Sequence, residues 1–308
     1  MHLTSLLPLL FVPSTLAWGM LGHRTTAVLA SRFLDPEAAS TIRTLLSPQS
    51  MITASTWADY YAHTPEGRYS APWHWIDARD SPPHSCGVTY SRDCPSDTGC
   101  IVSAIANNTM VAMGATPGDR AMALKWVIHF LGDIHQPLHT EDLLRGGNSI
   151  SVSFGGRTTN LHHVWDSSIA EKMRGGNSIR HAVSWADELH SAVVSGRYGN
   201  VTESWGTCLD PAKGEECAIE WATETNQWMC KYVLPATYPE GFAGSELDQE
   251  YYQGAKEIVE AQVAIAGWRM AGWLNAMFAG GDKMEEMMAR ATAGRTNALF
   301  DEEVYGEL

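Results

Sequence analysis

HFLGDIHQPLH, residues 129–139, ends an apolar segment whose spacing predicts a helix, and it is the densest cluster of metal-ligating side chains in the chain. On a helix, His129 and Asp133 lie on one face and one turn apart, so both can bind the same ion. Pro137 should end the helix and turn His139 back toward that face. The stretch therefore predicts a helix whose last turn carries part of a metal site.

Helical spacing of the apolar residues recurs along most of the chain, and this pattern predicts a mainly α fold. The segments that show it are residues 22–34, 119–135, 179–196, 214–233 and 250–279. Residues 148–161, NSISVSFGGRTTNL, alternate in polarity before a Gly-Gly turn and predict one small β-hairpin. We therefore expect a single compact multi-helix domain over residues 18–281.

The two ends of the chain differ in composition from this domain. Residues 1–17 form a short apolar run with small residues near its end, which predicts a signal peptide cut after Ala17 and a secreted protein. Residues 282–308 contain few large apolar side chains, and we expect a flexible or partly helical tail there. No later stretch has the roughly 20 uncharged residues that a membrane helix needs, so we expect no membrane anchor.

The chain is strongly acidic, with 35 Asp and Glu against 21 Lys and Arg and a net charge of −14. Proteins that follow a nucleic-acid backbone by charge alone normally present a basic face, and this balance argues against one. If the substrate is a phosphate ester, the positive charge that holds it must come from bound metal.

Six cysteines in a chain with an export signal predict three disulfides rather than a metal site. Closeness along the chain favours the pairs Cys94–Cys100 and Cys208–Cys217 and leaves Cys86 to pair with Cys230, although six cysteines allow other pairings. The sequons at Asn107 and Asn200 would accept N-glycans in the same compartment. We therefore expect a disulfide-bonded glycoprotein.

A second His/Asp pair with the same four-residue spacing, His162 and Asp166 in LHHVWD, repeats the arrangement of the first. Asp59 in TWAD and His74 and Asp77 in WHWID add ligand-type side chains beside tryptophans that could form a dry cavity. A single His is usually a helix cap or a core residue, and most of the tryptophans should simply pack in the core. Two such pairs nevertheless favour a metal site, and imidazole and carboxylate suit Zn²⁺ when the cysteines form disulfides.

In combination, the motifs of this chain resemble the S1/P1 nuclease family from Trp18 to about Phe278. The motifs that carry the resemblance are, in the family's order, WGMLGH, TWAD, PWHWIDA, DCPSDTGCIVSAI, HFLGDIHQPLH, GGNSISV and TNLHHVWD. The resemblance implies a disulfide-bonded, all-α enzyme with three zinc ions at the bottom of a cleft. It also implies hydrolysis of phosphodiester bonds in single-stranded DNA and RNA to 5′-mononucleotides, with 3′-nucleotides as further substrates.

The resemblance also assigns metal ligands position by position. One zinc would be held by Asp59, His74, His129 and Asp133, and a second by His139, His162 and Asp166. The third would be held by the α-amino nitrogen and carbonyl oxygen of Trp18, by His23 and by a bridging Asp133. Cleavage after Ala17 would therefore create a metal ligand. His135 and His163 do not match ligand positions. The candidate catalytic carboxylates are Asp59, Asp77 and Asp133.

The same resemblance points to residues that bind substrate. Trp75 and Asp97 stand where the family's base pocket has an aromatic ring and a carboxylate. At position 62, where the family commonly has a basic residue near the scissile phosphate, this chain has Ala62. His63 or Arg79 could supply the missing cation.

Two other functions remain as alternatives to a monomeric nuclease. A zinc phospholipase C would share the fold and the three metals, but its metal-binding motif usually ends in Glu where this chain has Asp166, and the loop at residues 84–100 is polar. A secreted non-catalytic binding protein on the same scaffold is favoured by Ala62 alone, because the set of ligands is intact.

Overall fold

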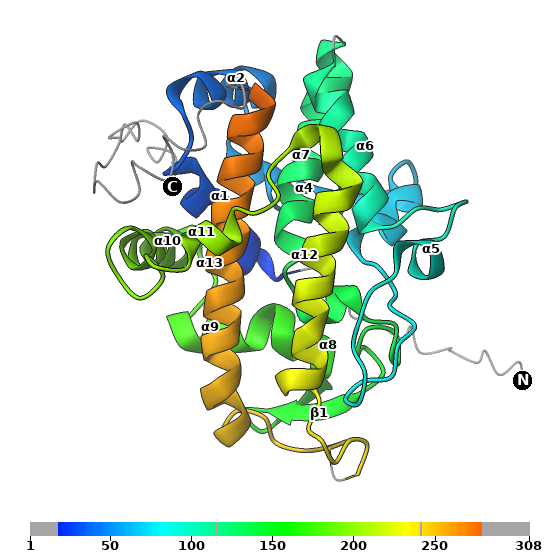
Figure 1. Ribbon diagram of the computed structural model, residues 1–308. Helices are drawn as coiled ribbons and strands as arrows, with labels where there is room; N and C mark the ends of the chain where they lie inside the picture. The colour runs from blue at the N-terminus through cyan, green and yellow to red at the C-terminus, as the bar shows by residue number, and fades with distance from the viewer. Residues whose placement is uncertain (1–17, 115, 241, 279–308) are drawn as a thin grey trace, which may run out of the picture.

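The computed structural model describes residues 18–114, 116–240 and 242–278, and these are mainly helical, as the sequence predicted (Figure 1). The expected signal peptide at residues 1–17 and the expected tail at residues 282–308 lie outside the described residues. Both therefore remain predictions, as does the end of the domain at residue 281.

The secondary structure consists of long and short helices and one pair of strands. The longer α-helices are α1 (Met20–Ser31), α2 (Pro36–Leu46), α6 (Ile101–Met113), α7 (Pro117–Asp133), α10 (Ile179–Val194), α12 (Gly214–Trp228) and α13 (Glu250–Phe278). The shorter α-helices are α3 (Met51–Ala54), α4 (Trp57–Ala62), α5 (Tyr90–Asp93), α8 (Leu161–His163), α9 (Ile169–Arg174) and α11 (Thr202–Trp205). The 3₁₀ helices are η1 (Arg68–His74), η2 (Pro137–Thr140) and η4 (Pro211–Lys213), the π-helical turns are η3 (Val164–Ser168) and η5 (Met229–Val233), and the strands are β1 (Ser151–Phe154) and β2 (Arg157–Asn160).

The long helix α13 organises the core, because it packs against α1, α2, α7 and α9 (Figure 1). Trp268 and Trp273 of α13 are fully buried, and so is nearly all of Arg269. The Arg269 guanidinium donates to the carbonyl of Trp205 and pairs with Glu224, which compensates its burial. Since α1 and α7 carry site residues, the same core fixes the position of the site.

Each of the five predicted helical segments overlaps a helix, namely α1, α7, α10, α12 and α13, with ends that differ by a few residues. Of the longer α-helices, α2 and α6 were not predicted, and neither were the six shorter ones. The sequence held a start signal for α2, because Asp35 precedes it and Pro36 occupies its first turn. Helix α6 buries one face, which includes Ile101, Ile105 and Thr109, but Met110 and Val111 outside that face are exposed, so its apolar residues do not mark the buried face clearly.

The predicted hairpin and the predicted disulfides are confirmed. Strands β1 and β2 pair antiparallel from Ser151 opposite Asn160 to Phe154 opposite Arg157. The disulfides join Cys86 to Cys230, Cys94 to Cys100 and Cys208 to Cys217. Among the described helices, none combines the length and the apolar character needed to cross a membrane.

Candidate metal centre

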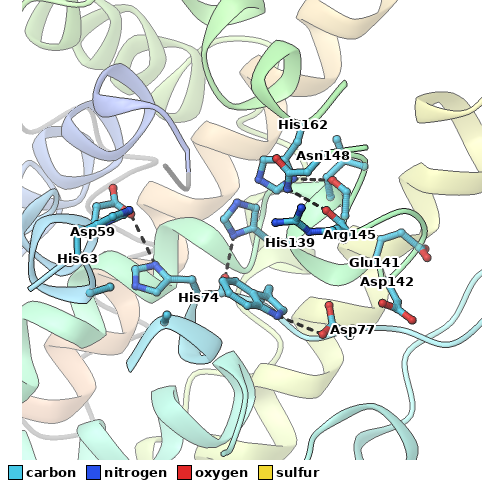
Figure 2. A pocket seen from close by; sticks show the side chains of 15 residues that line it. Asp59, His63, His74, Asp77, His139, Glu141, Asp142, Arg145, Asn148 and His162 are labelled. Carbon is cyan, nitrogen blue, oxygen red and sulfur yellow. Dashed lines mark hydrogen bonds and ion pairs between the residues drawn. The ribbon is translucent and has the colours of Figure 1, made fainter. Parts of the chain in front are cut away.

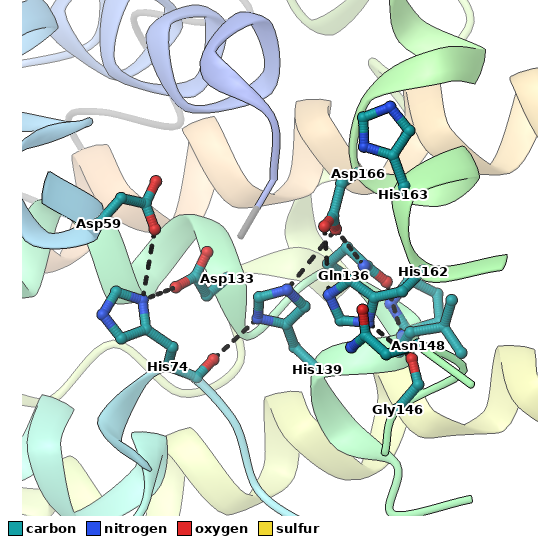
Figure 3. A network of polar contacts seen from close by, with 12 residues as sticks. Asp59, His74, Asp133, Gln136, His139, Gly146, Asn148, His162, His163 and Asp166 are labelled. Atoms are coloured by element: carbon teal, nitrogen blue, oxygen red, sulfur yellow. Dashed lines mark hydrogen bonds and ion pairs between the residues drawn. The ribbon is translucent and has the colours of Figure 1, made fainter. Parts of the chain in front are cut away.

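The last turn of α7 places His129 and Asp133 on one face, as the sequence predicted. Nε2 of His129 lies 3.0 Å from Oδ2 of Asp133, and both side chains are fully buried. Helix α7 ends at Asp133, and Pro137 begins η2, which carries His139 back to the same region (Figure 3). The stretch 129–139 therefore supplies three side chains to one buried region.

Asp59 from α4 and His74 from the end of η1 form a first group of potential ligands with His129. Oδ1 of Asp59 lies 3.4 Å from Nε2 of His129 and 3.7 Å from Nδ1 of His74. The same His74 nitrogen lies 3.2 Å from Oδ2 of Asp133. Four side chains from three elements thus converge on one point.

His23, in the first turn of α1, forms a second group with His129 and Asp133. Its Nε2 lies 3.0 Å from Oδ1 of Asp133, and its ring stacks on that of His129 with centroids 3.9 Å apart. Helix α7 can approach this closely because residue 132 is Gly, where a Cβ would lie 2.9 Å from Nδ1 of His23. Asp133 therefore faces the first group with one carboxylate oxygen and His23 with the other.

The segment that leads into α1 lies against the same region. Trp18 is fully buried, and the backbone N–H of Gly19 donates to the carbonyl of Asp166 at 2.8 Å. In Figure 3 the ribbon before α1 descends between Asp133 and Asp166. The backbone at position 18 is thus close to the side chains that the sequence assigned to the metal site.

His139, His162 and Asp166 form a third group. Nε2 of His162 lies 3.1 Å from Oδ2 of Asp166, and Nε2 of His139 lies 3.6 Å from Oδ1. This second His/Asp pair spans the junction of α8 with the π-helical turn η3 rather than a regular helix, and such turns are frequent at functional sites. The group is completed by Gln136, whose side-chain amide donates to Oδ1 of Asp166 and orients that carboxylate.

Three of the histidines are oriented by backbone carbonyl oxygens, to which each donates from Nδ1. The acceptors are the carbonyl of Ser55 for His129, of His74 for His139 and of Gly146 for His162, at 2.7, 2.8 and 2.6 Å. A bond of this kind fixes the tautomer and leaves Nε2 free to bind a metal ion. In all three cases Nε2 is the atom that faces a carboxylate of its group.

Several buried polar atoms of the centre form no hydrogen bond of suitable geometry with the described residues, even where a charged atom lies near, as Oδ1 of Asp133 does to Nε2 of His23. They are both ring nitrogens of His23, Nε2 of His74, Oδ1 of Asp133 and Nε2 of His139. Buried polar groups are normally paired, so these atoms indicate a missing partner. Within each group the ligand atoms lie within 4.8 Å of one another, and imidazole and carboxylate are zinc ligands. The residues therefore fit bound metal ions.

The charges of the centre favour cations. Burial by itself raises the pKa of Asp133, but the neighbouring His129 and His23 outweigh it and hold that pKa well below its usual range. Burial opposes a positive charge on His139, yet Asp133 and Asp166 raise its pKa to about 9. The carboxylates therefore stay ionised, and metal ions must displace protons from the imidazoles, so metal affinity should fall as pH falls.

A pocket of about 310 Å³ opens onto the centre (Figure 2). Of the side chains assigned to metals, those in its wall are Asp59, His74, His139 and His162. Trp75 and Asp77 also line it, and the indole N–H of Trp75 donates to Oδ2 of Asp77 at 3.2 Å. Burial, and then the nearby Asp142, raise the pKa of Asp77 to about 6.

The structure does not bring every predicted substrate-binding residue to this pocket. Ala62 and His63 line it, whereas Arg79 and Asp97 are not among its described lining residues. Asp97 is exposed in the loop closed by Cys94 and Cys100, and this loop is attached to Trp73, whose indole donates to the carbonyl of Thr98. The carboxylate that lies beside Trp75 is Asp77.

His135 and His163, which the sequence did not predict to be ligands, face away from the three groups. His135 is buried, donates from Nδ1 to the carbonyl of Leu131 and faces the Arg269 guanidinium with Nε2. His163 is exposed and points away from Asp166 (Figure 3). Neither residue belongs to a candidate metal group.

Several residues of the site were not predicted, among them Gln136 and Arg145 and the pocket carboxyl groups of Glu141 and Asp142. Gln136 lies between candidate ligands in HQPLH, and a polar side chain at that place could have indicated that it belongs to the site. Arg145 lines the pocket just before Gly146, but nothing in the spacing of the sequence indicated that it would.

The adjacent histidines 162 and 163 provide a matched test of the third group. His162→Ala should lower the bound metal by about one ion per molecule and reduce activity strongly, because its imidazole faces Asp166. His163→Ala should leave both unchanged, because this side chain is exposed. Metal analysis of the two purified variants checks the prediction, and equal metal content in both would contradict it.

The fold and the site define a helical protein with a buried His/Asp centre for several metal ions. The family model for S1/P1 Nuclease matches residues 18–279. Nuclease S1 of Aspergillus oryzae is 41% identical over 268 residues, covering 85% of this chain and 92% of that protein. Nuclease P1 of Penicillium citrinum is 38% identical over 263 residues, covering 84% and 97%, and Endonuclease 4 of Arabidopsis thaliana is 30% identical over 282 residues, covering 87% and 91%.

The chain therefore belongs to the S1/P1 nuclease family, and it is an enzyme of the phosphodiesterase class. This confirms the family resemblance drawn from the motifs. It also favours a nuclease over the phospholipase C and over a non-catalytic binding protein.

Proposed function

We propose that the protein is a secreted, zinc-dependent endonuclease that hydrolyses phosphodiester bonds of single-stranded DNA and RNA to 5′-mononucleotides and also acts on 3′-nucleotides. The observation that carries this proposal is the convergence of three His/Asp groups beneath one pocket. Zinc is the favoured metal because every candidate ligand is an imidazole or a carboxylate and all six cysteines are in disulfides.

The proposed ligands are those that the sequence assigned. One zinc is held by Asp59, His74, His129 and Asp133, a second by His139, His162 and Asp166, and a third by Trp18, His23 and Asp133. When bound, closely spaced zinc ions supply Lewis acidity that activates water and positive charge for the phosphate oxygens and the leaving group. The chain orients Nε2 of His129, His139 and His162 by the carbonyl oxygens that accept from Nδ1, keeps Asp133 ionised and presents the centre at the base of the pocket.

A preference for single strands follows from the pocket. A base can enter it only when it is unstacked from its neighbours, and Trp75 offers an aromatic face, with stacking worth about 1–3 kcal/mol per base. Asp77, held by the indole N–H of Trp75, can accept a hydrogen bond from the edge of that base. Asp77 thus takes the place proposed for Asp97 from the sequence, and Asp59 and Asp133 act as ligands rather than as proton carriers.

Asp77 predicts a pH dependence of substrate binding. With a pKa of about 6, its carboxyl is protonated at lower pH, loses its negative charge and becomes a weaker hydrogen-bond acceptor. In metal-saturated enzyme, KM for single-stranded DNA should therefore rise as pH falls through about 6, and Asp77→Asn should lose this dependence without losing metal. KM measured across this pH range checks the prediction.

Asp142 provides the control for this pH dependence. Because its charge raises the pKa of Asp77, Asp142→Asn should move the same transition to lower pH. Identical pH profiles for the wild type and Asp77→Asn would contradict the role of Asp77.

Secretion and a monomeric state complete the proposal. Residues 1–17 have the composition of a signal peptide, and three disulfides suit an oxidising compartment. The sequon residues Asn107 and Asn200 are exposed, as glycan acceptors must be. The N-terminal sequence, glycan content and mass of the protein recovered from the medium test these points together.

The proposed function is tested with one panel of substrates on purified, metal-analysed protein. We expect release of 5′-mononucleotides from denatured DNA and from RNA, slower cleavage of duplex DNA, and no headgroup release from phosphatidylcholine vesicles. Headgroup release without nucleotide release would instead indicate a phospholipase. Full metal content without turnover of any substrate would indicate a binding protein.

A further inference from the structure

The wall of the pocket is rich in carboxyl groups and poor in side chains with a permanent positive charge. The carboxyl groups that line it are those of Asp59, Asp77, Glu141 and Asp142, of which burial raises the pKa of Glu141 to about 8. Among the described lining residues Arg145 is the one Lys or Arg, and Figure 2 shows its guanidinium turned toward His139. A substrate with phosphate groups must therefore pass several carboxylates and one guanidinium.

The Arg145 side chain is exposed, and its guanidinium forms no hydrogen bond or ion pair with the described residues. Some other arginines of the chain are paired, such as Arg174 with Glu188 and Arg269 with Glu224. An unpaired guanidinium at a pocket keeps all its donors for a ligand, and no internal bond has to break when the ligand binds.

The backbone at Arg145 adopts a conformation that ordinary residues rarely adopt. Leu144 and Arg145 have φ of 50° and 61°, and Gly146 and Gly147 continue with 57° and 75°. This left-handed region favours Gly, so Arg at position 145 is less favourable for the backbone than Gly would be. Strain of this kind tends to be kept where a side chain has a function.

The same loop is fixed relative to the third group of ligands. The carbonyl of Gly146 accepts from Nδ1 of His162 at 2.6 Å, and a Cβ at Gly146 would lie 2.7 Å from the carbonyl oxygen of Leu138. The carbonyl of Arg145 accepts from the backbone and the side-chain amide of Asn148 at 3.1 and 2.8 Å. The loop therefore holds Arg145 at a set position beside the proposed zinc ligands.

We propose that Arg145 binds a phosphate oxygen of the substrate as the nucleic acid enters the pocket, and so supplies the cation that position 62 lacks. This inference rests on the proposed nuclease function. Guanidinium is the side-chain group whose geometry matches a phosphate, and it stays charged at every working pH. Neither His63 nor Arg79, the two candidates from the sequence, combines a place in the pocket with a permanent charge.

Arg145→Gln tests the proposal through the salt dependence of KM for single-stranded DNA. We expect kcat/KM to fall about ten- to a hundredfold, the scale of one hydrogen bond to a charged group. The slope of log KM against log salt should become shallower by roughly 0.7, the value for one phosphate contact on a single strand. The matched control is Arg157→Gln, an exposed arginine of β2 outside the pocket, which should change neither quantity.

Arg145→Gly separates a role in binding from a role in the fold. Gly relieves the left-handed strain, so the melting temperature should stay the same or rise while kcat/KM falls as it does in Arg145→Gln. Leu144→Gly relieves the same strain one residue earlier and should keep full activity, because Leu144 is not among the described lining residues. A merely structural Arg145 would instead lower the melting temperature when replaced by Gly.

A second-site change provides a rescue. Ala62→Lys in the Arg145→Gln background should restore part of the salt slope and of kcat/KM, because Ala62 lines the same pocket. An unchanged salt slope in Arg145→Gln, with or without a higher KM, would overturn the proposal, since it would exclude a phosphate contact. This result differs from a failure of the proposed nuclease function, because in that case the wild type itself would not cleave nucleic acid.

Discussion

Asp133→Asn is expected to reduce nuclease activity by roughly a thousandfold or more and to remove more than one metal ion per molecule. One oxygen of Asp133 lies 3.0 Å from His23, and the other lies 3.0 Å from His129 and 3.2 Å from His74. An amide has a single oxygen and no charge, so it cannot serve both groups. Metal analysis and the single-strand assay on the purified variant measure both effects.

The control for Asp133→Asn is His135→Ala, on the same segment but outside the three groups. It should leave the metal content unchanged, although it removes a buried partner of Arg269 and should lower the melting temperature. Equal loss of metal in the two variants would show that the wrong face of this segment had been assigned to the metal centre.

Protein that retains Met in front of Trp18 is expected to bind about two metal ions instead of three and to have little activity. A free α-amine, with a reference pKa of about 7.7–8.0, can lose its proton and bind a metal together with its own carbonyl oxygen. In an extended chain this nitrogen is an amide, which is a poor ligand at neutral pH. Trp18 is fully buried and Gly19 is bonded to Asp166, so the extra residue would also lie against the centre.

The extension is tested on two forms of one protein. A cleavable segment before Trp18 allows metal content and activity to be measured before and after its removal, with mass spectrometry to confirm the new N-terminus. We expect the third metal ion and the activity to appear together after cleavage. Three metal ions and full activity in the Met-extended form would contradict a ligand role for the backbone of Trp18.

Much of the fold could be predicted from the sequence, because amphipathic helices repeat their apolar residues at a fixed spacing. The spacing of His129 and Asp133 correctly predicted that the two side chains meet, as did that of His162 and Asp166. Helix α6 was missed because its apolar residues do not coincide with its buried face: Met110 and Val111 are exposed, while the polar Thr109 is buried.

The remainder of the site depends on contacts between distant segments. Asp59, His74 and His23 reach His129 from α4, η1 and α1, and no local spacing encodes such a meeting. The sequence patterns offered Asp59 and His74 as ligand-type side chains, but the family resemblance supplied their grouping with His129 and the ligand role of His23.

Two pocket residues show what the sequence patterns did not reveal. Whether a carboxylate reaches Trp75 depends on the path of its loop, and that path brings Asp77 there rather than Asp97. The position of Arg145 depends on a left-handed backbone that only the structure reveals.

The central claim is that three His/Asp groups hold three zinc ions that the nuclease needs. The most direct measurement starts from protein stripped of metal by a chelator and adds Zn²⁺ stepwise, with bound zinc and cleavage of single-stranded DNA followed at each step. We predict saturation at three ions per molecule, with most of the activity returning as the last sites fill. Full activity in the exhaustively stripped protein, or saturation at a single ion, would contradict the claim.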